Sequence, residues 1–178
     1  MLRFLFVLSI LICASPSFAE GAGSETAWLR GIPLHKAIRI GTGKHVVIEV
    51  SDPDCRFSRR MASYWNMRKD VTRYIFLVAM KNHPEAAQKG RYILTAADRA
   101  TAYQEVFAGD LDFNEKALDR HYEDHGVLDQ HSDVAAKLGV VGTPTYFIEG
   151  VKINGAKVGE IEQILGGKKI PFEVGDPE

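Results

Sequence analysis

One cysteine stands out as the residue in this sequence best placed to do chemistry. Cys55 follows the apolar run of residues 46–50 and the breaker Asp52-Pro53-Asp54, and it stands where a helix is expected to begin. A helix N-terminus carries partial positive charge and free N–H groups, so it favours a thiolate over a thiol. Strand, turn, cysteine and helix in this order therefore predict a reactive sulfur.

The residues around this cysteine set the expected mechanism. Arg56 favours the thiolate, whereas Asp52 and Asp54 oppose it, and the balance depends on their geometry. Ser58 occupies the position at which a second cysteine of a Cys-x-x-Cys motif is expected. A serine hydroxyl can donate a hydrogen bond to sulfur, but it cannot displace sulfur from a mixed disulfide. The pattern therefore predicts monothiol chemistry.

The N-terminus has the features of a secretory signal peptide over residues 1–19. Arg3 precedes an apolar run over residues 4–14, and Ser17-Phe18-Ala19 forms a small-x-small cleavage site. The apolar run is too short to span a bilayer. Cys13 lacks the small residue that a lipoprotein signal places before its cysteine, which argues against a lipid anchor. Cleavage after Ala19 removes Cys13 and leaves Cys55 as the single thiol, so no internal disulfide is expected.

Composition narrows the class of protein further. The chain has 22 basic and 23 acidic residues, and this near-neutral balance argues against nucleic acid as a partner. No later apolar stretch is long enough for a transmembrane helix. We therefore expect an exported protein of one domain without a stable membrane anchor.

The chain is expected to begin with a strand–helix–strand unit. A lead-in over residues 20–44 carries a short first strand around Ile38 and Ile40. The strand before Cys55 is followed by a helical pattern over residues 55–69, whose start Asp52 or Asp54 is expected to cap, and by a β-rich run over residues 71–80. This spacing predicts a βαβ unit with two parallel strands.

Helical patterns follow over residues 84–94, 95–108, 114–124 and 129–138, forming an insertion over about 84–138. Pro84 is expected in the first turn of the first of these helices. Pro144 then stands directly before a strand over residues 145–148, and a cis X-Pro bond would explain a proline there. A hairpin to residues 151–153 and a last helix over residues 160–165 complete the pattern.

These elements resemble the thioredoxin fold, an α/β fold, with a helical insertion between its βαβ and ββα units. More narrowly, the chain resembles the DsbC/DsbG-like family of periplasmic thiol:disulfide interchange proteins. The likeness rests on the turn and cysteine motif over residues 50–58, on His83-Pro84 with residues 96–100, and on Gly139-Val140-Val141-Gly142-Thr143-Pro144-Thr145. The domain is expected over residues 45–178.

The resemblance implies roles for particular residues. Cys55 would be the nucleophile with Ser58 beside it, and Arg56, Phe57, Thr143 and Pro144 would contact an extended substrate peptide. Phe57 and the aromatic residues Tyr64, Trp65 and Tyr146 are candidates for an apolar peptide-binding surface, with core packing as the expected place of Trp65. No cofactor is expected.

Two departures from the family limit the mechanism. The family's N-terminal dimerisation domain has no room in this chain, and Ser58 replaces its resolving cysteine. The expected function is thiol–disulfide interchange of the isomerase or reductase kind, through mixed disulfides with exported proteins or small thiols. An external thiol reductant or redox partner must then release Cys55. The alternative is a redox-inactive binding module or chaperone, attached to a conjugation or type IV secretion system.

A metal site is the remaining alternative. His121 and His125 lie four residues apart on a predicted helix, with His131 nearby, and this spacing suits zinc. The order His-Tyr-Glu-Asp-His nevertheless matches neither zincin motif. Histidines on a solvated helix are the commoner case, so no metal is assigned.

Overall fold

The computed structural model describes residues 27–166, and the expected signal peptide lies outside these residues. A five-stranded sheet has the order β1-β3-β2-β4-β5. Its strands are β1 (Ile38–Ile40), β2 (His45–Ser51), β3 (Val71–Leu77), β4 (Thr145–Ile148) and β5 (Val151–Asn154). Strands β2 and β3 are parallel, as predicted, whereas every other neighbouring pair is antiparallel.

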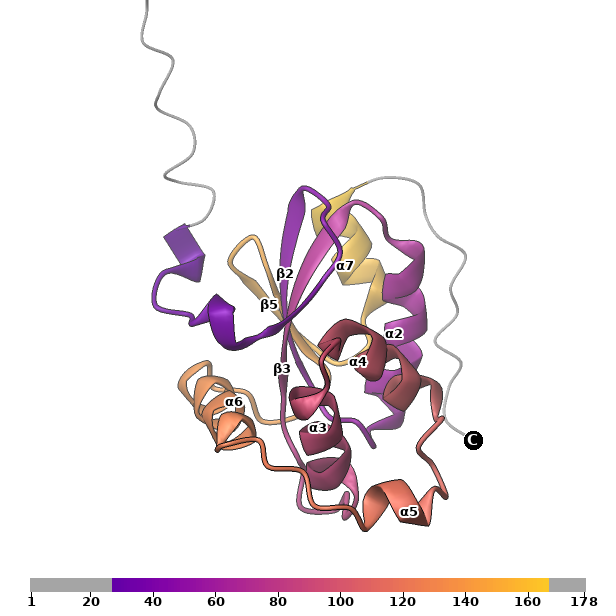
Figure 1. The fold of residues 1–178 in the computed structure, drawn as a ribbon. Helices are drawn as coiled ribbons and strands as arrows, with labels where there is room; N and C mark the ends of the chain where they lie inside the picture. Colours follow the sequence, from indigo (N-terminus) through magenta and orange to yellow (C-terminus); the bar gives the residue numbers. More distant parts are fainter. Residues whose placement is uncertain (1–26, 167–178) are drawn as a thin grey trace, which may run out of the picture.

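Helices cover both faces of this sheet (Figure 1). Helices α2 (Arg56–Met67), α4 (Arg99–Ala108) and α7 (Val158–Leu165) lie on one face. Helix α6 (Val127–Lys137) lies on the other, with the 3-10 turns η1 (Ala27–Leu29) and η2 (Leu34–Lys36). Helix α3 (Ala86–Thr95) packs against α4 and α6, and α5 (Glu115–Leu118) is a single turn.

The alternation of side chains along β2 explains why both faces are covered. Val47 belongs to the core beneath α2 and α7, whereas Ile48 and Val50 belong to the core beneath α6. All three are fully buried. A strand buried on both faces reads as a continuous apolar run, which is what the sequence before Cys55 shows. The predicted α/β thioredoxin-like fold with a helical insertion is therefore confirmed.

The predicted helix over residues 114–124 is wrong. Asn114 caps α5 by accepting a hydrogen bond from Ala117 N–H, but α5 ends at Leu118. The chain then runs irregularly to Gly126, which precedes α6 with a φ of 75°. Most residues between Leu118 and Gly126 are exposed or half-buried and polar, so they have no apolar face whose burial would extend the helix.

Two smaller differences concern the start of the insertion. Strand β3 ends at Leu77, three residues earlier than predicted, and Pro84 lies before α3 rather than in its first turn. The intervening segment is held by polar contacts to the end of β2, described below.

Candidate active site

Cys55 lies between the end of β2 and the start of α2, as the sequence predicted. It is the N-cap residue of α2, and its own N–H donates to the carbonyl of Asp52 at 3.1 Å. The expectation that Asp52 or Asp54 caps the helix is wrong, because the helix start has no side-chain cap. Asp52 instead accepts the N–H of Asp54 at 2.7 Å and so closes the turn itself. No carboxylate cap therefore competes with Cys55 for the free N–H groups at the start of α2.

A second segment, distant in sequence, meets the sulfur. Cys55 Sγ donates to the carbonyl oxygen of Thr143 at 3.2 Å, across 88 positions of sequence. The Thr143–Pro144 peptide bond is cis, in agreement with the sequence-based expectation. Cys55 is a free thiol with 7 % of its surface exposed, and it lies between this loop and the start of α2.

The loop that carries the cis bond is held by hydrogen bonds around Pro144 and is exposed at Val141. Thr145 Oγ1 donates to the carbonyl of Gly142 at 2.7 Å, and the carbonyl of Pro144 accepts Gly155 N–H at 2.7 Å. Pro144 is buried, whereas Val141 is 86 % exposed. Hydrogen bonds therefore hold the loop backbone, and Val141 exposes an apolar side chain two residues before Thr143.

The other predicted site residues lie on the first turn of α2. Ser58 is fully buried, and its Oγ has no hydrogen-bond partner within residues 27–166. Arg56 is exposed, and its guanidinium carbon lies 4.9 Å from the centroid of the half-buried Phe57 ring. Arg56 thus places a positive charge and Phe57 an apolar surface beside Cys55, while Ser58 lies below the surface.

The two aspartates that were expected to oppose the thiolate both have partners. Asp52 is fully buried, accepts Met80 N–H at 2.7 Å, and lies 3.0 Å from His83 Nδ1. Asp54 accepts hydrogen bonds from Lys89 at 2.7 Å and from Arg59 at 3.2 Å. Backbone N–H groups therefore satisfy the Asp52 carboxylate, and two cations offset the charge of Asp54.

The expected aromatic peptide-binding surface is largely absent from the described residues. Tyr64, Trp65 and Tyr146 are at most 2 % exposed and pack in the core, so of the four candidates only Phe57 remains partly accessible. The patterns that suggested a surface were the inward face of α2 and the inward side of β4.

A buried ion pair beneath α2 was not predicted. Glu49 on β2 and Arg73 on β3 are both at most 1 % exposed, with Arg73 Nη1 2.9 Å from Glu49 Oε2. Tyr103 donates to the other carboxylate oxygen at 3.0 Å. Burial opposes the charge on Arg73, but Glu49 raises the pKa of Arg73 above its usual value. Sequence offered one signal: both charged residues interrupt otherwise apolar strands.

The histidine pair considered for zinc does not form a helical face. His121 and His125 lie in the irregular segment before α6, and each side chain is 86 % exposed. His131, the third histidine, is fully buried. Its Nδ1 accepts Leu77 N–H at 3.0 Å, and its Nε2 lies 2.9 Å from the Lys36 carbonyl. The three histidines therefore do not converge.

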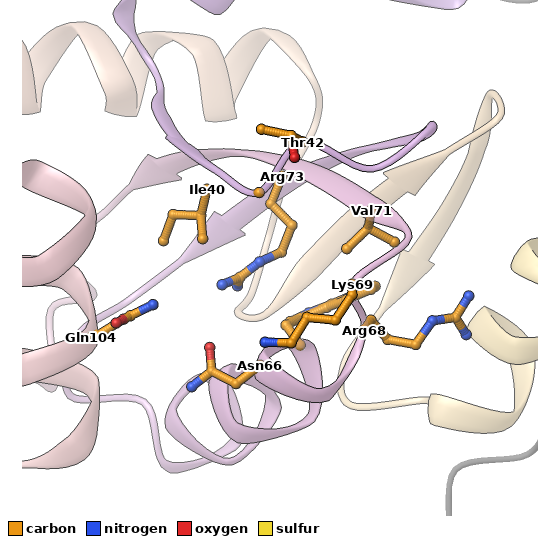
Figure 2. A pocket seen from close by; sticks show the side chains of 10 residues that line it. Ile40, Thr42, Asn66, Arg68, Lys69, Val71, Arg73 and Gln104 are labelled. Carbon is orange, nitrogen blue, oxygen red and sulfur yellow. The ribbon is translucent and has the colours of Figure 1, made fainter.

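A cavity of about 280 Å³ lies near the end of α2 and the start of β3 (Figure 2), whereas Cys55 lies at the start of α2. Its lining includes Arg68, Lys69 and Arg73 with the amide side chains of Asn66 and Gln104. Arg68 is paired with Asp70 and Glu162, and Arg73 with Glu49. The cavity is separate from the cysteine site.

No helix in the described part of the chain is long and apolar enough to cross a membrane.

Several solved structures are similar to this chain. A disulfide interchange protein from Neisseria gonorrhoeae is 28 % identical, with a TM-score of 0.57 over 68 % of this chain and 86 % of that one. The catalytic domain of Proteus mirabilis ScsC is 18 % identical, with a TM-score of 0.60 over 80 % and 93 %. A periplasmic thioredoxin-like protein from Salmonella enterica serovar Typhimurium is 18 % identical, with a TM-score of 0.54 over 73 % and 86 %.

No curated protein matches the sequence. A family model described as a thioredoxin-like domain matches residues 36–166. This range includes all five strands of the sheet and the helices α2 to α7. The match spans both segments that meet at Cys55, the helix N-terminus and the cis-proline loop. This chain therefore belongs to the thioredoxin-like domain family.

Proposed function

We propose that this protein is an exported thiol–disulfide interchange protein that acts through a single nucleophile, Cys55. The observation that carries the proposal is the contact between Cys55 Sγ and the Thr143 carbonyl, which joins the start of α2 to the cis-proline loop. The neighbour from Neisseria gonorrhoeae, named as a disulfide interchange protein, supports the activity. The Salmonella neighbour, named as periplasmic, supports the compartment.

The reaction proceeds in two exchanges. The Cys55 thiolate attacks one sulfur of a substrate disulfide, forms a mixed disulfide and releases the other substrate sulfur as a thiolate. Because Ser58 cannot carry out the second attack, a thiolate from outside the chain must displace Cys55. That thiolate comes from the substrate itself, which gives isomerisation, or from an external thiol reductant. In the second case the substrate is left in a mixed disulfide with the reductant, and a second reductant thiol cleaves it, which completes the reduction.

The contacts of substrate would be made beside the sulfur. Arg56 and Phe57 offer a charge and a ring on α2, and the loop at Thr143 and Pro144 offers backbone for an extended peptide. Proteins with cysteines or disulfides are therefore the substrate class. The near-neutral charge balance of the sequence argues against nucleic acid as a partner.

Adduct formation tests the proposal. The protein is incubated with oxidised glutathione or with a protein whose disulfides are scrambled, and the products are weighed and mapped by mass spectrometry. One adduct on Cys55, absent in Cys55→Ser, is the expected result. A folded protein whose Cys55 stays unmodified by both reagents would instead favour the redox-inactive binding module.

A further inference from the structure

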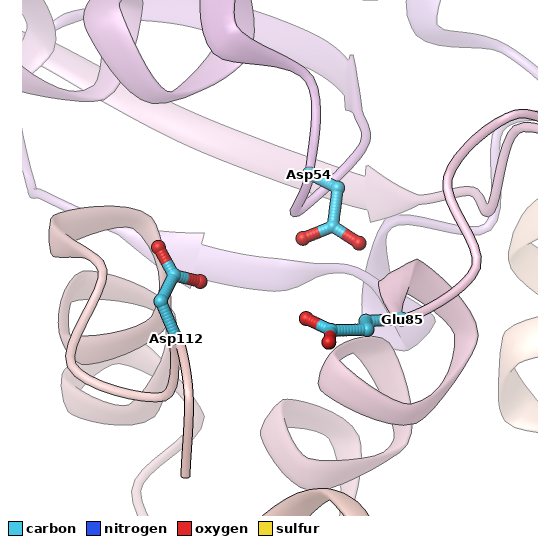
Figure 3. Close-up of side chains that lie close together, drawn as sticks. All are labelled: Asp54, Glu85 and Asp112. Atoms are coloured by element: carbon cyan, nitrogen blue, oxygen red, sulfur yellow. The ribbon is translucent and has the colours of Figure 1, made fainter.

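A buried lysine lies at the centre of three carboxylates beside the active-site turn. Lys89 on α3 is 2 % exposed, and its Nζ lies 2.7 Å from Asp54, 2.7 Å from Asp112 and 2.8 Å from Glu85. Figure 3 shows these carboxylates, from the turn before Cys55, the start of α3 and the loop after α4, directed toward one another. Within residues 27–166 they form the one acidic group compact enough for a metal ion. The cation among them is the ammonium of Lys89.

A second cation joins the cluster from α2. Arg59 Nη2 lies 2.9 Å from Asp112 and 3.2 Å from Asp54, and Arg59 Nε donates to the Pro53 carbonyl. The hydrogen bond from Arg59, with that from Lys89, lowers the pKa of Asp112 to about 2. Burial opposes the charge on Lys89, but the hydrogen bonds that Lys89 donates to its carboxylate partners leave its pKa raised. The ionised forms are therefore favoured at neutral pH.

The charge balance of this cluster bears on Cys55. Two cations serve three carboxylates, so the cluster carries one net negative charge, and removal of Lys89 would leave two. Asp54, adjacent to Cys55 in the chain, would then retain Arg59 alone as its cation. A nearby unneutralised carboxylate disfavours a thiolate, because like charges repel across a partly buried site.

We propose that Lys89 is a positioning residue for Cys55: it neutralises Asp54, anchors the Asp-Pro-Asp turn to the helical insertion, and so favours the thiolate. The inference rests on the proposed function in taking Cys55 as the reacting group. It also gives the helical insertion a role at the active site, since Lys89 lies on its first helix.

The test is the pH profile of Cys55 alkylation by iodoacetamide, measured with Lys89→Met in the full chain. The midpoint of the profile should move to higher pH by about half to one unit, so that alkylation at the original midpoint slows by about twofold to fivefold. Lys157→Met is the matched control, because it makes the same substitution in the exposed Lys157–Glu160 pair and should leave the midpoint unchanged.

Neutralising the aspartate separates this role from simple structural support. Asp54→Asn alone should move the midpoint to lower pH, and adding Lys89→Met to it should raise the midpoint by less than Lys89→Met does in the unsubstituted chain. An unchanged midpoint in folded Lys89→Met overturns the proposal, as does an undiminished shift in the Asp54→Asn background. If Lys89→Met fails to fold, an unchanged midpoint in Asp54→Asn still overturns it. Alkylation needs no disulfide, so failure of the proposed function appears separately, as the absence of a glutathione adduct.

Discussion

Removing Arg73 is expected to destabilise the protein strongly, because it leaves the buried carboxylate of Glu49 without its cation. Both residues are at most 1 % exposed, and among residues 27–166 Arg73→Met would leave the Glu49 carboxylate with a single hydrogen bond, from Tyr103. Breaking one side of a buried pair costs about 3–5 kcal/mol. This loss is a large fraction of the stability of a domain of this size.

Urea unfolding followed by tryptophan fluorescence measures this change, since Trp65 is buried and its ring centroid lies 5.9 Å from the Arg73 guanidinium carbon. The control is the double variant Arg73→Met with Glu49→Gln, in which the uncharged amide can still accept from Tyr103. It should recover about half or more of the lost stability. A loss below about 1 kcal/mol in Arg73→Met, or no recovery in the double variant, would refute the view that the buried charge dominates.

Three further results follow from the described contacts. Ser58→Cys should create dithiol activity, measured as faster insulin reduction in the presence of dithiothreitol; a folded variant without it would contradict the inferred geometry at Cys55. The lowered pKa of Asp112 contributes to the free energy of unfolding. This contribution is complete above pH 3.8, the usual pKa of the carboxyl group, and is lost as pH falls toward about 2. Asp112→Asn should therefore remove at most about 2 kcal/mol of the pH dependence of stability, measured by acid unfolding. Burial lowers the pKa of His131, so stability should be full above about 6.5 and fall as pH drops below it; His131→Gln should abolish this dependence, whereas the exposed His121→Gln should keep it.

Local patterns were sufficient to predict most of the fold. The apolar run of β2, the turn at Pro53 and the helix after Cys55 are each read from neighbouring residues, and the structure has all three. The helix predicted over residues 114–124 was also read from neighbouring residues, but here local signals were not sufficient. It has a good cap at Asn114 but no apolar face, and helix length in proteins depends on burying such a face.

The candidate site was predictable where it depends on motifs and unpredictable where it depends on contacts between them. Cys55 and Pro144 were found from turn chemistry, and their meeting through Thr143 follows from the fold that the resemblance implied. The sequence did not predict the ion-pair partners of Asp54, which are Lys89 and Arg59. Asp112 lies 58 positions away, and the Glu85–Lys89 spacing suggests an ordinary surface pair until the fold buries the lysine.

The lifetime of the mixed disulfide between Cys55 and glutathione tests the central claim most directly. The adduct is formed with oxidised glutathione, freed of excess reagent and followed by mass spectrometry with and without added reduced glutathione. The account predicts that it persists alone and is released by the added thiol, because Ser58 cannot displace the sulfur. Failure to form the adduct, or its release without any external thiol, would contradict the claim that Cys55 captures its partner alone but depends on another thiol for release.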